Sequence, residues 1–192
     1  MSTFPLFYSG SVGYFQSLLA ADSVQFEVHE HFIKQTQRNR LEILGPNGRQ
    51  LLVIPTLKSA GKRTTGNVKI SHAENWQKEH WKSLEAAYQR SPYFEFYEHE
   101  FEPFYVNKIE LLSDFNLQFM KTILRLLKLD LNHTKTDEYV SNENDLRIST
   151  FPLLEDKQYL QVFGDRHPFE PNLSILDALF NLGPQSAGLI IS

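Results

Sequence analysis

The segment KQTQRNR carries the residues in this chain best suited to binding an anion. It places Lys34, Arg38 and Arg40 within seven positions, and Asn39 stands between the two arginines. A guanidinium group offers phosphate or carboxylate a planar fork of donors, whereas lysine supplies a point charge. In an extended chain Arg38 and Arg40 would share one face and could grip a diphosphate, with Asn39 on the other. The segment therefore predicts an anion site, and a solvated basic face is the alternative.

The distribution of charge along the chain favours the same third of the molecule. Residues 34–69 hold eight cations and one acid, Glu42, which gives +7. Because the whole chain carries −4, the remainder carries −11. Such segregation favours an anionic ligand or partner for this third of the chain. The acidic remainder argues against nucleic-acid binding, which needs a broad basic surface.

The loop YSGSVGYF is a second candidate for phosphate binding. It lies between the first predicted strand and the first predicted helix, where α/β folds hold phosphates against helix N-terminal amides. Gly10 and Gly13 do not complete a G-x-G-x-x-G motif, and no Walker lysine follows. A plain strand-to-helix turn, with Ser11 as the N-cap of the helix, is the simpler interpretation.

Two titratable residues fall inside apolar helical stretches. His80 lies between Trp76 and Leu84 on the apolar stripe of its predicted helix, so it is either a satisfied core histidine or a general base facing a cleft. Asp177 would occupy the third helical position behind the predicted N-cap Ser174. There its carboxylate either favours the first-turn amides or points into a cleft.

Metal and thiol chemistry are not indicated. His29 and His31 would project from one strand face with Glu27, but no third metal ligand is identifiable, so neither a metal nor another cofactor is predicted. The chain has no cysteine, which excludes disulfides and thiolate nucleophiles. The G-x-S-x-G and H-E-x-x-H signatures of common hydrolases and metalloproteases are absent.

The predicted elements begin with strand, helix and strand. This βαβ start favours an α/β fold with a mixed sheet and a helix-rich C-terminal half, and α+β is the competing class. A length of 192 residues suits a single domain spanning 1–192. We expect strands at 5–10, 23–32, 67–71 and 159–163, a hairpin at 39–55, an irregular connection at 130–150, and helices at 12–21, 73–91, 111–130 and 173–183, with a shorter one inside 92–105.

The composition is that of an ordinary globular protein, with 41% hydrophobic and 22% charged residues. The N-terminus lacks the basic start and apolar run of a secretory signal. No apolar stretch approaches the roughly 20 residues of a membrane helix. We expect a soluble cytoplasmic protein without a membrane span, and the sequence does not define its oligomeric state.

Several motifs together resemble the WbqC-like protein family. The likeness begins in GYFQSLLAADSVQFEVHEHFIKQTQRNRLEI, continues through LLVIP, NWQKEHWKSLEAAYQRSPYFEFY and YLQVF, and closes with FEPNLSILDALFNLG. One departure is in the first loop, where the family often has a Tyr-Leu-Pro pattern and this chain has FYSGS. The positions that match family motifs are Gly13, Tyr14, Lys34, Asn39, Arg40, Pro55, Trp76, His80, Tyr88, Pro92, Tyr93, Ser174 and Asp177.

The resemblance implies a role in surface-polysaccharide (O-antigen-type) biosynthesis, and glycine transfer onto sugars has been suggested for some members. We therefore expect a transferase-like enzyme acting on a nucleotide-activated or phosphorylated sugar. Its predicted site has His80 as general base together with Asp177, a ligand held by Lys34, Arg38, Asn39 and Arg40, and a pocket wall of Tyr14, Tyr88 and Tyr93.

The alternative is a non-catalytic binding or scaffolding protein. Its basic strand would dock an anionic partner, and the acidic and aromatic segment from Tyr93 to Tyr105 would form another contact. Geometry separates the two hypotheses. Convergence of Lys34, Asn39, Arg40 and His80 in one concave pocket would favour the enzyme, and their dispersal would favour the scaffold.

Overall fold

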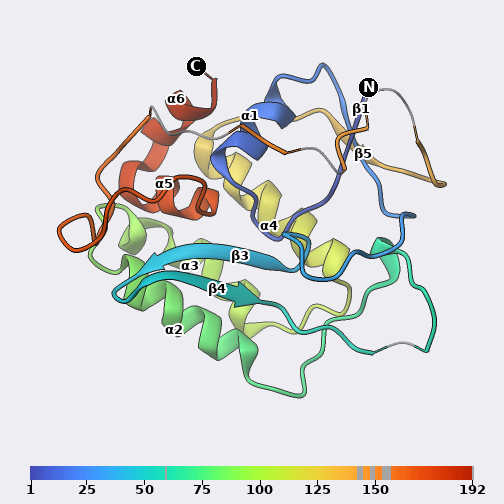
Figure 1. Ribbon diagram of the computed structural model, residues 1–192, viewed down its shortest axis with the longest axis horizontal. Coiled ribbons are helices and arrows are strands. Elements are labelled where there is room, and N and C mark those ends of the chain that lie inside the picture. Colours follow the sequence, from blue (N-terminus) through green and yellow to red (C-terminus); the bar gives the residue numbers. More distant parts are fainter. Residues whose placement is uncertain (59, 142–144, 148–149, 153–156, 192) are drawn as a thin grey trace.

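The chain opens with the predicted βαβ unit (Figure 1). In the computed structural model, β1 (Ser2–Phe4) and β2 (Val24–Phe26) pair in parallel, and α1 (Val12–Leu19) connects them. β5 (His133–Lys135) pairs in parallel with the other side of β2. The structure describes residues 1–192 except 59, 142–144, 148–149, 153–156 and 192. The α/β class is thereby confirmed.

The predicted hairpin forms a second, separate sheet. β3 (Arg40–Gly45) and β4 (Gly48–Val53) are antiparallel, and Gly45 stands opposite Gly48. Leu41 and residues 43–45 of β3 are buried, whereas Arg40 and Glu42 are half-buried. The parallel and antiparallel pairings of the predicted mixed sheet thus lie in two sheets, and the hairpin has an inner apolar face and an outer charged one.

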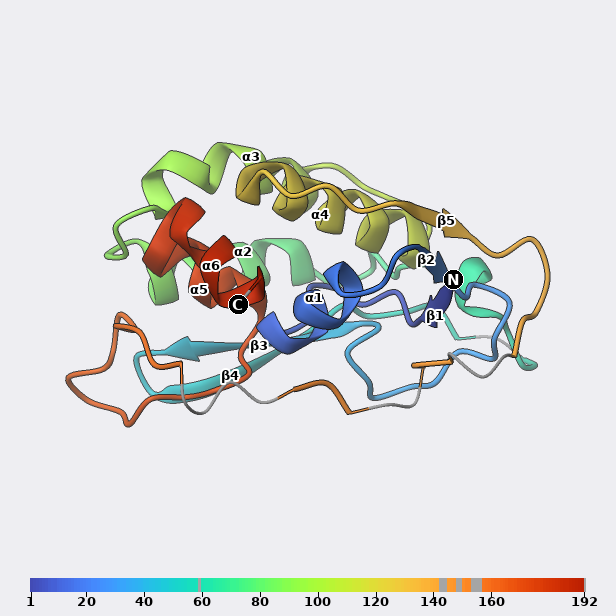
Figure 2. The same cartoon turned by 90° about the horizontal axis from the view of Figure 1, so that it is seen from above.

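Helices make up most of the second half of the chain, as predicted. α2 (Trp76–Tyr88), α3 (Phe94–Val106) and α4 (Leu112–Leu127) follow one another, and α5 (Ile175–Leu182) and α6 (Ser186–Ile191) come last. The described residues also form two short 3-10 turns, Thr65–Asn67 and Gly183–Gln185. In Figure 2, α3 and α4 form a layer on the side opposite the hairpin. α1 and α5 lie between this layer and the hairpin. Among the described residues, no helix is long and apolar enough to cross a membrane.

Aromatic side chains join these layers into one core. Phe101 of α3 lies 5.2 Å from Phe119 of α4 and 5.5 Å from Phe180 of α5, measured between ring centroids. All three are fully buried. Burial of each such ring stabilises the fold by about 1.5–3 kcal/mol relative to exposure. The core therefore fixes the position of α5, whose N-terminus contributes to the site described below.

Two predicted strands differ from expectation. The first, predicted at 5–10, does not form there: β1 precedes it and ends at Phe4, because Pro5 has no N–H to donate to a ladder. The second ends at Phe26, and the Glu27 carboxylate then accepts a hydrogen bond from the His29 amide at 2.6 Å, which turns the chain out of the sheet. The end of β1 at Phe4 leaves residues 5–11 as an irregular segment before α1.

Three further predictions about local structure were wrong. Residues 159–163 form no strand, because Tyr159 and Gln161 direct their side chains to Asp177 instead of pairing in a sheet. Residues 67–71 make only isolated bridges. Residues 133–135, inside the stretch predicted to be an irregular connection, form β5 and pair with β2.

Candidate functional site

A cavity of about 230 Å³ lies on the outer face of the hairpin, where segments from the first and last parts of the chain meet it. Its walls come from the loop before α1, from the turn before β3, from the hairpin itself and from the residues before α5. The lining residues are Gly10, Ser11, Gln35, Thr36, Gln37, Arg40, Leu41, Glu42, Leu51, Asn172 and Ser174.

Three contacts bring the distant walls of this cavity together. The hydroxyl oxygens of Ser9 and Ser174 are within hydrogen-bonding distance of each other. The Ser174 amide donates to the Glu42 carbonyl at 2.8 Å, and the Ile175 amide donates to the Gly10 carbonyl at 2.8 Å. Because all of these polar groups are paired, the three segments are held in one arrangement.

Two helix N-termini meet at the cavity. Ser11 caps α1 and accepts a hydrogen bond from the Tyr14 amide at 3.3 Å. Ser174 caps α5 and accepts one from the Leu176 amide at 3.2 Å. Both capping residues were predicted from the sequence and are confirmed. The positive ends of both helix dipoles therefore favour negative charge in this region.

Arg40 brings a full positive charge to the same wall. It is half-buried, and its Nε atom is buried without a hydrogen-bond partner among the described residues. The one carboxylate in the lining, that of Glu42, is bound by Arg49 at 2.7 Å, and Arg49 also binds Glu170 at 2.7 Å. Because other groups neutralise Glu42, the charge of Arg40 is available to a ligand.

Asn172 adds an acceptor. Its backbone has a φ of 58°, in the left-handed region that non-glycine residues seldom adopt. Its side-chain oxygen Oδ1 is buried and has no partner within the described part of the chain. A buried acceptor of this kind costs free energy unless a donor reaches it, so a ligand hydroxyl would complete the site.

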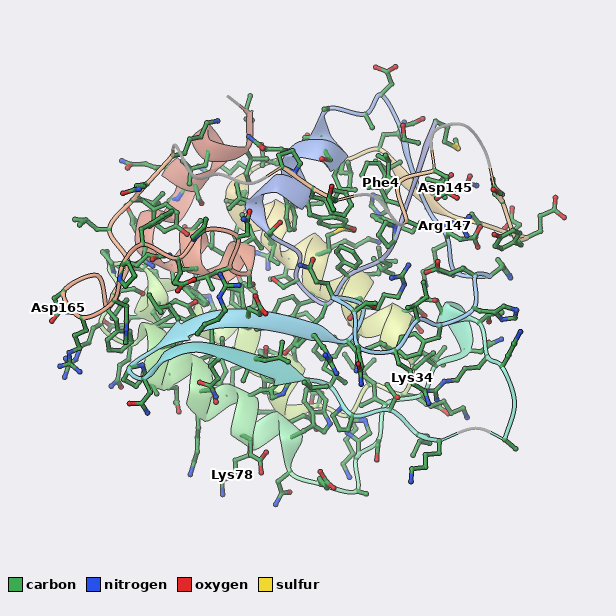
Figure 3. All side chains as sticks on the ribbon, viewed as in Figure 1. Phe4, Lys34, Lys78, Asp145, Arg147 and Asp165 are labelled. Atoms are coloured by element: carbon green, nitrogen blue, oxygen red, sulfur yellow. The ribbon has the colours of Figure 1, made fainter. Side chains whose placement is uncertain are left out.

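Arg38 lies elsewhere. Residues 38–39 precede β3, so the two arginines do not share a strand face. The Arg38 side chain is buried, and its Nε donates to Glu30 at 2.6 Å. Arg147 lies 3.9 Å from the other oxygen of Glu30 and pairs with Asp145 (Figure 3). Arg38 thus belongs to a buried ionic cluster.

The other predicted ligand-binding residues also lie off the cavity wall. Asn39 is buried and donates from Nδ2 to the Ile54 carbonyl at 2.9 Å. Lys34 is exposed in the turn before the cavity-lining residues. Tyr14 is buried and donates to the Pro5 carbonyl at 2.7 Å. Tyr88 is buried in the core, and Tyr93 is half-buried beside Tyr97.

His80 is a buried residue of the core. Its Nδ1 lies 3.1 Å from the Tyr8 hydroxyl, which in turn lies 2.8 Å from the Tyr105 hydroxyl. The Trp76 ring packs against it at 5.0 Å. Burial lowers the pKa of His80 to about 4, although the Val53 backbone acts in the opposite direction. The imidazole is therefore neutral at pH 7.

Asp177 occupies the third position of α5, as predicted, and is buried. It accepts hydrogen bonds from the Tyr159 hydroxyl at 2.7 Å and from Gln161 Nε2 at 2.9 Å. Burial raises the pKa of its carboxyl, and these hydrogen bonds oppose the rise. Tyr159 and Gln161 line a different cavity, of about 420 Å³, beside Arg90.

Of the predicted site residues, the cavity brings in Arg40 and leaves Lys34, Asn39 and His80 outside its lining. Asn172 was not predicted as a site residue. Its position two residues before the predicted N-cap Ser174 could have indicated it. No group of three histidines and acids within the described ranges could hold a metal ion.

Comparison with known proteins agrees with the resemblance seen in the sequence. The sequence model of the WbqC-like protein family matches residues 8–164. The chain belongs to this family. The match includes Ser9, Ser11 and Arg40 and stops before Asn172 and Ser174.

One relative of this WbqC-like protein is the uncharacterized protein Rv1507c of Mycobacterium tuberculosis. The two are 24% identical over 210 residues, which cover 91% of this chain and 90% of the relative. No solved structure matches the chain significantly.

Proposed function

We propose that this WbqC-like protein is a transferase-like enzyme that binds a phosphorylated or nucleotide-activated sugar of surface-polysaccharide assembly in the hairpin cavity. The observation that carries the proposal is the Arg40 guanidinium, which has no partner in the described part of the chain and lies beside two capped helix N-termini. An anion gains there from a charged donor and from both helix dipoles.

The size of the cavity bears on which part of the substrate it holds. About 230 Å³ is below the 300–1,000 Å³ that commonly encloses a drug-sized ligand. A sugar phosphate head group suits this volume better than a complete nucleotide-sugar. In the nucleotide-activated form, the nucleoside would extend past Leu51 into solvent.

The roles of the residues follow from their positions. Arg40 holds the phosphate oxygens, and Asn172 accepts a hydrogen bond from a sugar hydroxyl. In transfer, an acceptor hydroxyl attacks the anomeric carbon, the bond from that carbon to the phosphate oxygen breaks, and the phosphate leaves on Arg40. Glu42 lines the cavity and His80 does not, so the carboxylate oxygen Oε1 of Glu42, which Arg49 does not bind, takes the acceptor proton. Glycine transfer stays a prediction of the family resemblance.

Binding measurements test the first part of the proposal. Titration calorimetry with glucose 1-phosphate, UDP-glucose and inorganic phosphate should show salt-sensitive binding, and glucose alone should bind less. Arg40→Ala should raise the dissociation constant by about tenfold or more, since a hydrogen bond to a charged group is at stake. Arg90→Ala, an exposed arginine outside this cavity, is the matched control. Equal losses in both variants would exclude the cavity as the anion site.

The non-catalytic alternative is favoured by one observation, namely that Lys34, Asn39, Arg40 and His80 do not converge. Release of UDP from UDP-glucose separates the two functions. Turnover that is lost in Glu42→Gln and retained in His80→Gln supports the enzyme with the proton acceptor at Glu42. Tight binding with no release of UDP under any condition supports the binding protein.

A further inference from the structure

We propose that two neighbouring loops form a surface that binds the anionic headgroups of a lipid membrane. The two-loop surface consists of Ile33 and Lys34 on one loop and Leu57, Lys58 and Lys62 on the other, all exposed. The loops lie side by side beyond the end of the hairpin (Figure 1).

Backbone contacts hold the loops together. The Phe32 amide donates to the Arg63 carbonyl at 2.9 Å, and His31 bridges Thr64. The Arg63 guanidinium lies over the Phe32 ring at 5.3 Å and donates to Thr56 Oγ1 at 2.8 Å and to the Leu57 carbonyl. Arg63 therefore fixes the relative position of the loops, and the lysines remain for a partner.

The lysine charges of this surface are not neutralised by the protein. Three other cations in the basic third of the chain have carboxylate partners: Arg38 binds Glu30, Arg49 binds Glu42, and Lys69 binds Glu110. Lys34, Lys58 and Lys62 form no ion pair with the acids that the structure describes. The acidic helix α3 lies in the opposite layer of the molecule (Figure 2). Such polarity orients this surface toward a negative partner.

The aliphatic residues determine which negative partner fits best. Ile33 is 43% exposed and Leu57 is 46% exposed, and each directly precedes a lysine, Lys34 or Lys58. At a bilayer surface an aliphatic side chain enters the headgroup boundary while the neighbouring lysine extends its ammonium group to the phosphates. A flexible acidic polypeptide or a nucleic acid would use the lysines and gain little from the two aliphatic side chains. The observations therefore favour a lipid surface.

This inference does not depend on the proposed transferase function. Gln35, Thr36 and Gln37 directly follow Lys34 and line the hairpin cavity, so binding would bring the cavity close to the membrane. Arg40→Ala should impair sugar-phosphate binding and leave membrane binding unchanged. Failure of one proposal can therefore be distinguished from failure of the other.

Vesicle flotation with the complete chain tests the inference. At 50 mM salt, the protein should float with vesicles of phosphatidylcholine and phosphatidylglycerol but not with phosphatidylcholine alone, and 500 mM salt should weaken the binding. Lys34→Gln/Lys58→Gln/Lys62→Gln should lower the partition coefficient on the order of 100-fold, at about fivefold per lysine. Ile33→Ser/Leu57→Ser should lower it about tenfold with no change in charge.

The control has the same change in charge at other sites. Lys78→Gln/Lys82→Gln/Lys121→Gln removes three exposed lysines of α2 and α4, and Figure 3 shows Lys78 well apart from Lys34. Circular dichroism should show all variants folded. The inference is overturned if the wild type does not float with anionic vesicles or if the control triple loses as much binding. It is also overturned if the protein binds polyglutamate and not vesicles, because the partner would then be a soluble acidic chain.

Discussion

The hydroxyl oxygens of Ser9 and Ser174 lie 2.6 Å apart, although 165 positions separate the two residues in the chain. The pair is buried and joins the irregular segment after β1 to the N-cap of α5. The hairpin cavity is therefore shaped by a contact of very long range.

The serine pair should show measurable coupling. Ser174→Ala removes both this contact and the N-cap, so it should lower the free energy of unfolding by about 1–3 kcal/mol, and Ser9→Ala should lower it by about 1 kcal/mol. The double variant should lose less than the sum of the two by about 1 kcal/mol. Urea denaturation of the four proteins completes the cycle. Strict additivity would mean that the two hydroxyls do not stabilise each other.

Gly10 should not tolerate a side chain. Its φ is 73°, and a Cβ atom there would lie 2.4 Å from the Tyr14 ring. Gly10→Ala should therefore destabilise the protein by at least about 1 kcal/mol, and it should weaken sugar-phosphate binding by shifting the start of α1. Gly188→Ala in α6 is the control, since a Cβ there meets no atom within 4 Å. Similar melting temperatures for the two variants would contradict the expectation.

Stability should decline in mild acid through His80. The folded protein keeps this imidazole neutral with a pKa of about 4, whereas the unfolded chain protonates it near 6.5. Between these values the unfolded state binds the additional proton, so stability is fully present above pH 6.5 and about 3 kcal/mol of it is lost as the pH falls to 4.

Comparison with a histidine variant isolates this effect from the titration of carboxylates. The free energy of unfolding of His80→Gln should depend less on pH between 6.5 and 4 than that of the wild type. His99→Gln, in which the replaced side chain is 70% exposed, should retain the wild-type slope. If His80→Gln and the wild type give parallel curves, the buried neutral imidazole is not the cause.

Arg38 should prove essential for stability. Arg38→Ala leaves the Glu30 carboxylate buried without its nearest partner and should cost about 3–5 kcal/mol. Arg38→Met/Glu30→Gln removes both charges and should cost much less. Arg166→Ala, at a side chain that is 56% exposed, should change the free energy of unfolding by less than about 0.5 kcal/mol.

The double variant of this ion pair also tests where the ligand binds. If Arg38→Met/Glu30→Gln folds, it should retain sugar-phosphate binding, because Arg40 and both helix N-termini are unchanged. Loss of sugar-phosphate binding in a folded double variant would indicate that Arg38 contributes to the anion site, as the sequence predicted.

The sequence predicted those features that depend on neighbouring residues. The turn at Gly45–Gly48 defines the hairpin, and Ser11 and Ser174 cap their helices, because each of these signals acts within a few positions. The early end of the second strand was not predictable in the same way, because it depends on the hydrogen bond that the Glu27 carboxylate accepts from the His29 amide.

The candidate site was predicted in part. Arg40 and the loop before α1 were each predicted as possible anion-binding features. No short-range sequence pattern indicates that the two lie at the same cavity. The different fates of Arg38 and Arg40 depend on Glu30, which takes Arg38 into the interior. Asn172 is brought to the site by the contacts of Ser174 with Glu42 and Ser9. These contacts join residues far apart in the chain, so no local sequence pattern predicts them.

The long separation between the cavity walls has a consequence for biosynthesis. A chain leaving the ribosome presents Arg40 long before Asn172 and Ser174 have been added. Until α5 is made and docks against the Ser9 segment, the guanidinium has no enclosing wall and the ligand has no closed site. Binding competence should therefore arise late and abruptly during translation, so that sugar-phosphate binding by nascent chains would report that synthesis has passed α5.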